Sequence, residues 1–358
     1  MQIGLTGMPA AGKTTLFNVL CGSSYPTGIG GGDDTHTGSA LVPDQRIDFL
    51  SDIYKPKKKV YARIEFKDIP GARMDDSPAR AARLLDEVRG ADALVQVLRV
   101  FSDPVAEAVA GEPDPYSDLL NFESELILAD MDSLEKRIGR IEDNPKGKKD
   151  AAAQLALLKK LLSALENEER LSNIALDQTE KDLLAGQQFL SEKPVFLLVN
   201  LDEKTLKERS YPDRDKIISY SREKNIPMIE VCARAEMEIG ELDPAERSLF
   251  MNELGIEESG LDLLARTAYE SLNLLSFFTV GDDEVRAWTV TRGTDARRAA
   301  GKIHSDFEKG FIRAEVFHYD HIRELGSAAK VREAGHFRLE GKEYTVKDGD
   351  VISFRFNV

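Results

Sequence analysis

The chain has 358 residues, of which 42% are hydrophobic and 31% charged, the balance of a soluble globular protein with two or three domains. Its net charge of -15 opposes non-specific nucleic-acid binding, which requires clustered Lys and Arg. No apolar run reaches the roughly 20 residues of a membrane span, and two cysteines are too few for a structural zinc site. We expect a cytosolic protein without a membrane partner. After about residue 280 acids and bases nearly cancel, so any nucleic-acid surface is expected there.

The first predicted elements surround a glycine loop. Residues 2–6 are apolar and predict a short buried strand, and residues 14–20 carry apolar side chains at helical spacing. Between them Gly7 to Thr14 match the pattern G-x-x-x-x-G-K-[ST], in which backbone N–H groups and the lysine bind phosphates and the hydroxyl binds Mg²⁺. The predicted nucleotide-binding residues here are Pro9, Ala10, Ala11, Gly12, Lys13, Thr14 and Thr15. The sequence therefore predicts a P-loop nucleotide site.

A second phosphate-site motif follows a glycine-rich loop at residues 22–36. Residues 60–68 alternate like a strand that ends at Asp68-Ile-Pro-Gly71. A P-loop protein needs a carboxylate here to hold Mg²⁺ and a glycine whose N–H senses the γ-phosphate. We expect Asp68 to act on the metal with Thr14. Lys13 and Gly71 are the candidates for catalysis, and no water-positioning residue is identified.

The next apolar strands complete the predicted nucleotide-binding domain. Residues 93–100, 195–199 and 228–232 read as buried strands separated by helical patterns, which predicts a parallel sheet covered on both faces. Asn200-Leu201-Asp-Glu203 follows one of them, where guanine-specific relatives carry Asn-Lys-x-Asp. We expect Asn200 to hydrogen-bond a purine, with Glu203 making strict guanine specificity doubtful. Backbone N–H groups of Cys232 and Ala233 are expected to close over the base.

Residues 121–189 follow a different pattern, that of two helices packed on each other. Apolar residues repeat at 4-3-4-3 spacing at Ile127, Met131, Leu134, Ile138 and Ile141, and again at Ala151, Leu155, Leu158, Leu162 and Leu165. The link between them contains Pro145 and Gly147 and is short enough to make the helices antiparallel. We expect an inserted coiled-coil hairpin that closes on itself, so the chain is expected to be a monomer.

The last part of the chain, residues 277–358, reads as a separate α+β domain with a mixed sheet. Strands are predicted at residues 285–290, 311–317, 336–339, 344–346 and 351–356, with a helix at 299–309 and a tight 347–350 hairpin turn. The overall fold class is therefore α/β. It comprises a P-loop domain of residues 1–120 and 190–276 with a mainly parallel sheet, the helical insertion and the small C-terminal domain.

These residues resemble the YchF/Obg-like ATPase family over essentially the whole chain. The most specific stretches are residues 287–289, 299–313, 346–351 and 356–358. The resemblance implies that the C-terminal domain is a TGS domain of β-grasp fold. It also implies ATP preference through the Asn-x-x-Glu motif, Mg²⁺ as cofactor, slow hydrolysis, and a ribosome partner. A hydrophobic residue replaces the catalytic glutamine in the family, and the basic group Lys302, His304 and Arg313 is a candidate for ribosomal RNA contact or for packing on a neighbouring domain.

The chain departs from the family pattern at the phosphate site. Ala10-Ala11 replace the family's Asn-Val, which weakens the case for a catalytic potassium ion, and Thr14 replaces Ser. Glycines at 28–32 replace an aromatic-containing segment with a threonine that meets Mg²⁺, so Thr35 and Thr37 are both candidates, with Thr37 the tentative metal ligand. Residues 72–78 replace a longer glycine-rich stretch, and Arg73 among them is a weak catalytic candidate.

Three functional hypotheses remain open from the sequence. The first is a Mg²⁺-dependent, slow ATPase whose nucleotide state regulates ribosome binding. The second is a nucleotide-gated ribosome- or RNA-binding module with vestigial hydrolysis, because no residue after Gly71 plausibly positions water. The third is a true GTPase.

Overall fold

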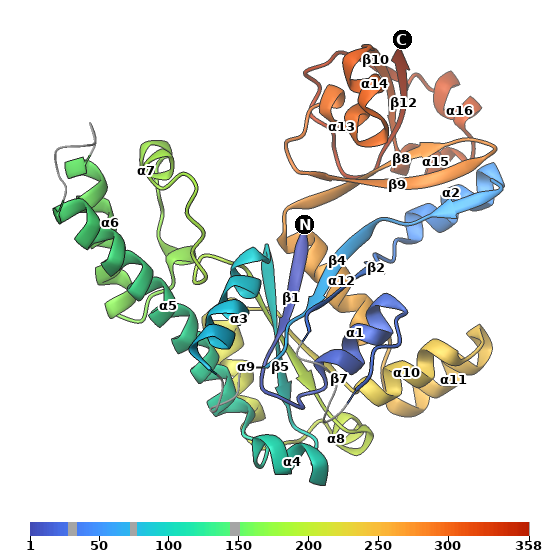
Figure 1. The fold of residues 1–358 in the computed structure, drawn as a ribbon. Helices are drawn as coiled ribbons and strands as arrows, with labels where there is room; N and C mark the ends of the chain where they lie inside the picture. Colours follow the sequence, from blue (N-terminus) through green and yellow to red (C-terminus); the bar gives the residue numbers. More distant parts are fainter. Residues whose placement is uncertain (28–33, 72–76, 144–150, 358) are drawn as a thin grey trace. The chain divides into compact units, whose positions relative to one another are not determined.

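The chain divides into two compact units, shown as ribbons in Figure 1. The computed structural model describes residues 1–27, 34–71, 77–143 and 151–357. The first unit comprises Met1–Gly38 and Glu65–Leu261, and the second comprises Ser39–Ile64 and Asp262–Val358. This division differs from the predicted one, which kept residues 39–64 in the P-loop domain and began the last domain at residue 277. Among the described residues no helix is long and apolar enough to cross a bilayer.

The first unit is built on a six-stranded sheet of order β2-β4-β1-β5-β6-β7. Its strands are β1 (Gln2–Thr6), β2 (His36–Leu41), β4 (Arg63–Asp68), β5 (Ala93–Arg99), β6 (Val195–Asn200) and β7 (Met228–Val231). The pairs from β4 through β7 are all parallel, which confirms the predicted mainly parallel sheet. Because parallel strands end at the same edge, the loops after β1, β4, β5, β6 and β7 gather there.

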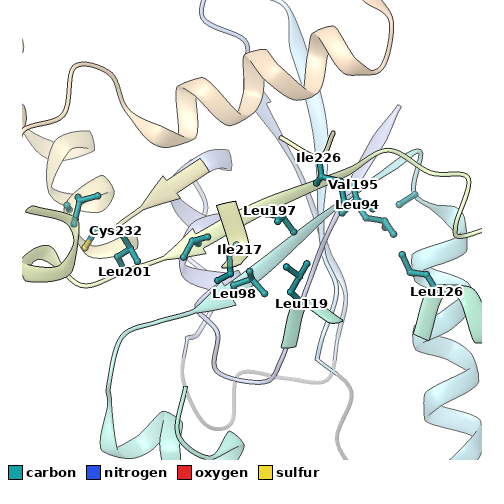
Figure 2. Packing of buried hydrophobic residues seen from close by; sticks show 14 of the residues in the cluster. Leu94, Leu98, Leu119, Leu126, Val195, Leu197, Leu201, Ile217, Ile226 and Cys232 are labelled. Carbon is teal, nitrogen blue, oxygen red and sulfur yellow. The ribbon is translucent and has the colours of Figure 1, made fainter. Parts of the chain in front are cut away.

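Helices join these strands and cover the sheet. They are α1 (Lys13–Cys21), α3 (Pro78–Gly90), α4 (Pro104–Ala110), α8 (Glu203–Glu208), α9 (Arg214–Glu223), α10 (Ala233–Glu241) and α11 (Pro244–Leu254). Every residue of β5 and β6 is buried, as expected for central strands covered on both faces. Figure 2 shows this core, in which Leu98 of β5 and Leu197 of β6 belong to one cluster with Leu119 and Ile217 of the covering helices.

The helical insertion is continuous with the sheet domain. Helix α5 (Pro115–Asp143) begins before the predicted boundary at 121, and its first half packs on the sheet core through Leu119 and Leu126. Its second half packs beside α6 (Ala151–Glu166), the 3-10 helix η2 (Leu171–Asn173) and α7 (Gln178–Leu183) in a separate apolar cluster. Since α6 contacts η2 and α7 as well as α5, it also buries Leu157 and Leu161, which the predicted seam omitted. The predicted link at 144–150 lies outside the described residues.

One buried carboxylate fixes this insertion to the strand that follows it. Asp130 of α5 is fully buried and accepts hydrogen bonds from the backbone N–H groups of Leu190 and Ser191, at 2.9 and 2.7 Å, and from the Ser191 hydroxyl at 2.7 Å. These residues lie just before β6. A buried charge is tolerated only when its oxygens are satisfied in this way.

We predict that Asp130→Ala lowers the free energy of unfolding by about 3 kcal/mol, because two buried N–H groups and a hydroxyl lose their acceptor. Asp132→Ala on the same helix is the matched control, since that carboxylate is 60% exposed and pairs only with Lys136 among the described residues. The control should change stability by less than about 0.5 kcal/mol. Urea denaturation followed by circular dichroism measures both, and equal effects of the two substitutions would contradict the anchoring role.

The second unit is built on a six-stranded mixed sheet of order β11-β10-β12-β8-β9-β3. Its strands are β3 (Lys58–Val60), β8 (Leu274–Val280), β9 (Glu284–Thr291), β10 (Phe311–His318), β11 (Arg338–Glu340) and β12 (Asp350–Phe356). Its helices are α2 (Gln45–Tyr54), α12 (Gly260–Ser271), which begins in the first unit, α13 (Ala296–Ile303), α14 (Ser305–Lys309), α15 (Tyr319–Leu325) and α16 (Ala328–Glu333). The mixed sheet was predicted, but β8, α15 and α16 were not.

Three local predictions are corrected in this part of the chain. The single strand predicted over residues 60–68 is two strands, because β3 pairs with β9 and β4 pairs with β1 in a different sheet. The helix predicted over 299–309 breaks at His304, whose ring accepts the Asp306 N–H and caps α14. Residues 344–346 form only an isolated bridge to Asp295, so the 347–350 turn joins no regular hairpin.

Residues 39–64 are integral to the second unit. Strand β3 pairs in parallel with β9, with Lys58 opposite Glu284. The Arg46 guanidinium of α2 donates to the carboxylates of Asp44 and Asp348 and lies 5.1 Å from the ring centre of Phe278. Two carboxylates and an aromatic face hold this one side chain, which fixes α2 on its sheet.

Candidate nucleotide-binding site

The loop between β1 and α1 has the backbone that the P-loop pattern predicts. Gly7 and Gly12 have φ values of 134° and 91°, which side chains other than glycine rarely adopt. A Cβ atom on Gly7 would lie 2.4 Å from the Val97 carbonyl oxygen, and one on Gly12 would lie 2.3 Å from Nδ2 of Asn200. Neither position therefore admits a side chain. Ala10 also has a positive φ, 59°, at a strain of about 1 kcal/mol for a residue with a Cβ.

Lys13 begins α1 and is folded back onto the loop. Its side chain is buried, and Nζ donates to the carbonyl oxygens of Gly7 and Met8 at 2.9 and 2.8 Å. Burial lowers the pKa of Lys13 to about 8, and the negative charge of Asp68 opposes part of that shift. The ammonium group thus lies over the loop with incomplete compensation of its charge, so an anion bound in the loop would stabilise it.

The hydroxyl and carboxylate predicted to hold Mg²⁺ are brought together. Thr14 Oγ1 donates to Asp68 Oδ2 at 2.7 Å, and Asp68 is only 4% exposed. The other oxygen, Oδ1, is buried and has no hydrogen-bond partner within the described part of the chain. A buried carboxylate oxygen without a donor fits a cation, and Mg²⁺ usually takes one or two carboxylates together with substrate phosphates. The described residues contain no cluster of three or more His, Cys, Asp or Glu for a metal.

The two candidate switch threonines differ in their surroundings. Thr37 lies in β2 and is exposed. Thr35 lies just before β2, and its Oγ1 is buried and lacks a hydrogen-bond partner among the residues described. Between the two, the buried hydroxyl of Thr35 is the one left with an unused oxygen.

Gly71 packs directly against the phosphate loop. A Cβ atom here would lie 2.6 Å from the backbone nitrogen of Pro9 and 2.8 Å from the Gly7 carbonyl oxygen. The glycine after β4 is therefore required for the close approach of two backbones, whichever other role it has. Arg73 and its neighbours at 72–76 lie outside the described residues.

Asn200 joins three loops at the edge of the sheet. Its side chain is buried, Nδ2 donates to the Ala11 carbonyl oxygen at 3.0 Å, and Oδ1 accepts the N–H of Ala233 at 3.1 Å. The Ala233 N–H, which the sequence predicts to close over the base, thus already has an acceptor within the protein. For the predicted purine contact, Asn200 retains the second Nδ2 hydrogen and the second lone pair of Oδ1.

The neighbouring predicted residues divide between core and surface. The Leu201 side chain is buried in the sheet core, and Cys232 is buried at the start of α10. Burial raises the pKa of the Cys232 thiol, and the charges of Glu203 and Asp202 add to that shift, which places these carboxylates near the thiol. Asp202 caps α8 by accepting the Thr205 N–H at 2.8 Å. Glu203 begins α8 and is half-buried.

Phe101 is a site residue that the sequence analysis did not select. It follows β5 at the same edge of the sheet, and its ring carbon Cε1 would lie 3.9 Å from a Cβ on Gly12. The half-buried ring therefore borders the loop on the side of Asn200. An aromatic residue directly after a buried parallel strand was the available signal.

Comparison with known proteins decides the family. A protein of Bacillus subtilis named "Ribosome-binding ATPase YchF" is 41% identical over 100% of this chain and 100% of its own length. The chain belongs to the YchF family. A similarly named Escherichia coli O157:H7 protein is 39% identical over 100% of this chain and 99% of its own length. A family model described as YchF-GTPase_C, protein of unknown function (DUF933), matches residues 274–357.

A solved structure confirms the YchF fold. The structure entitled "Structure of the Schizosaccharomyces pombe YchF GTPase" superposes with a TM-score of 0.86 at 29% identity, covering 99% of this chain and 97% of that one. The predicted resemblance and fold class are therefore confirmed, and the chain is a P-loop nucleoside triphosphatase of this family.

The buried ammonium of Lys13 predicts a pH dependence of nucleotide binding. The folded-state pKa of about 8 lies below the ordinary value of 10.5, so the free protein loses this proton as the pH rises through 8. Phosphate binds the protonated form and raises the pKa, so nucleotide affinity should weaken by up to about tenfold per pH unit above pH 8. Fluorescent-nucleotide titrations from pH 6.5 to 9.5 measure this.

Lys13→Ala is the control for that titration. It should bind weakly and show no step near pH 8, because the remaining pH dependence belongs to the nucleotide. An affinity of the unaltered chain that stays constant between pH 7 and 9.5 would contradict a depressed pKa at this lysine.

Proposed function

We propose that this YchF-family chain is a Mg²⁺-dependent, slow ATPase whose nucleotide state regulates its binding to the ribosome. The observation that carries the proposal is the buried pairing of Thr14 and Asp68 beside Lys13 on a phosphate loop. These are the groups that a nucleoside triphosphate with its metal requires. Residues Pro9 to Thr15 would surround the phosphates.

The metal site proposed for Mg²⁺ uses Thr14 and Asp68, with the phosphates as further ligands. When bound, Mg²⁺ neutralises developing charge on the β- and γ-phosphate oxygens. The unpartnered Oδ1 atom of Asp68 supports a cation there. Thr35 replaces Thr37 as our candidate for the switch threonine, because its unpartnered hydroxyl is buried whereas Thr37 is exposed.

The preference for ATP rests on Glu203. A guanine-specific site uses an aspartate whose two oxygens accept from the base edge, and the longer side chain of Glu203 at that position disrupts this geometry. The names of relatives differ on this point, since the Bacillus subtilis protein is named an ATPase and the Schizosaccharomyces pombe structure a GTPase. The Phe101 ring beside the loop is our candidate for stacking on the base.

Slow hydrolysis follows from what the site offers to the chemistry. Lys13 supplies positive charge and Gly71 an N–H near the position of the γ-phosphate, and both stabilise charge without activating water. The residue directly after Gly71 is Ala72, which is neither a glutamine nor a large apolar residue. The competing proposal is a nucleotide-gated binding module with vestigial hydrolysis. It uses the same binding residues and differs only in whether the bound nucleotide is hydrolysed.

Ribosome binding is proposed from the relatives' names. The Bacillus subtilis and Escherichia coli proteins are both called ribosome-binding, and this chain covers their whole length. A cytosolic location and a monomeric state are part of the same proposal.

The proposal is tested by single-turnover hydrolysis together with ribosome co-sedimentation. We expect phosphate release above the rate without protein, its loss in Lys13→Ala because the phosphates lose their main cation, and different ribosome occupancy with ADP and a non-hydrolysable ATP analogue. Ribosome binding that depends on the nucleotide without any enzymatic phosphate release would replace the ATPase by the binding module. Ribosome binding indifferent to nucleotide would refute the regulation.

Base preference is tested with Glu203→Asp. Parallel titrations should show that the unaltered chain binds ATP more tightly than GTP. The shorter carboxylate should improve GTP binding by about 1–3 kcal/mol, the range for a good bidentate contact to a base. Glu208→Asp, an exposed residue at the end of the same helix, is the matched control and should change neither affinity. Equal or tighter GTP binding by the unaltered chain would reject the adenine preference.

A further inference from the structure

The sheet of the second unit has a buried face and a partly exposed face. Ala314 and Val316 of β10 and Ile352 of β12 lie in the core cluster that includes the alanines of α13. Because side chains alternate along a strand, Arg313 of β10 and Arg355 of β12 point away from α13. Figure 1 shows α13 and α14 on one side of β10 and β12, with α16 on the other.

This geometry separates residues that the sequence had grouped together. Lys302, His304 and Arg313 were the candidate RNA-contacting group. Lys302 lies on α13 and His304 directly follows it, whereas Arg313 points to the opposite face of the sheet. On the exposed face Arg313 instead lies with Arg332 and Arg355, which are distant from it in sequence.

Two arginines share one carboxylate on this face, and a third lies beside them on the neighbouring strand. Arg313 and Arg355 are direct cross-strand partners, and both are exposed. Arg332 of α16 and Arg355 lie 2.9 and 3.7 Å from the same oxygen of Glu315, and the pKa of Glu315 is lowered, mainly by the Arg332 hydrogen bond. Among the described residues Arg313 has no hydrogen bond or ion pair of its own. We call Arg313, Arg332 and Arg355 the arginine face.

Like charges directly opposite each other on two strands are unfavourable unless an anion compensates them. Glu315 is one charge against three guanidinium groups, so the arginine face carries an excess of positive charge in a chain whose net charge is -15. The guanidinium fork matches the geometry of a phosphate group. The face therefore suits a ligand with closely spaced phosphates.

We propose that the arginine face binds the phosphate backbone of RNA, a contact that rests on the proposed ribosome binding and locates it. Ile312 beside Arg313 and Leu339 opposite Glu315 are both exposed and supply apolar surface for sugars and bases. An acidic protein surface is the weaker fit, because protein interfaces place apolar residues at the centre and charges at the rim. On this face Arg313 and Arg355 are instead directly paired on adjacent strands, and Arg332 of α16 reaches the same Glu315 carboxylate.

The test compares two double variants that each remove two positive charges from the second unit. Arg313→Ser with Arg355→Ser alters the arginine face, and Arg298→Ser with Lys302→Ser alters α13 on the other side of the sheet. Binding to a fluorescein-labelled 20-base-pair RNA duplex is followed by anisotropy between 50 and 200 mM salt. Thermal melting and nucleotide affinity confirm that both variants remain folded and that the phosphate loop is intact.

We expect the arginine-face variant to bind this RNA about 10- to 100-fold more weakly at ~0.1 M salt, with the slope of log K against log salt reduced by about 2, one for each lost contact. The α13 variant should bind like the unaltered chain. Equal losses in both variants, or an unaltered chain without salt-dependent RNA affinity, would overturn the inference.

Ribosome co-sedimentation of the same variants separates this inference from the proposed function. Loss of ribosome binding only in the arginine-face variant, together with its weaker RNA binding, supports the RNA contact. Loss on ribosomes with unchanged affinity for free RNA overturns it in favour of an acidic ribosomal protein. If the arginine-face variant binds ribosomes as well as the unaltered chain, the arginine face alone is refuted. If the unaltered chain itself binds no ribosomes, the proposed function is refuted.

Discussion

The nucleotide site depends on the buried amide of Asn200. It bonds to the P-loop through Ala11 and to the start of α10 through Ala233, so loops that follow β1, β6 and β7 are fixed relative to one another. Gly12 is required because any side chain there would strike this amide. Asn200, which the sequence suggests for base recognition, thus acts in the folded chain as a structural tie between these loops.

The second consequence of this packing concerns the charge at the centre of the site. Lys13 is buried against carbonyl oxygens, and Asp68 Oδ1 is buried without a donor from the described residues, so two incompletely compensated charges lie near the loop. Each costs stability in the free protein, and the metal-bound triphosphate proposed for the site would compensate both. The arrangement therefore lowers the stability of the ligand-free protein, as is common at functional sites, where residues are kept for binding.

Sequence reasoning succeeded where the determining contacts are local. The phosphate loop and the apolar strands of the first sheet follow from spacing within a few residues, and the structure has them. It failed at residues 58–68, because the choice between two sheets is made by β9, where Lys58 meets Glu284. The sequence also could not show that the Asn200 side chain bonds to the protein itself, because Ala233 becomes its neighbour only in the folded sheet.

The same non-local pairing constrains how the two units are joined. The chain passes between them at three points, after Gly38, after Ile64 and after Leu261. Ser39 comes four residues after Thr35 and Ile64 four before Asp68, so two of the three connections adjoin groups proposed for the metal. Since β3 and Arg46 fix the intervening segment within the second unit, residues 39–64 belong to that unit although both of their ends lie in strands β2 and β4 of the parallel sheet. The third connection lies within α12, so there a single helix is continuous between the two parts of the chain.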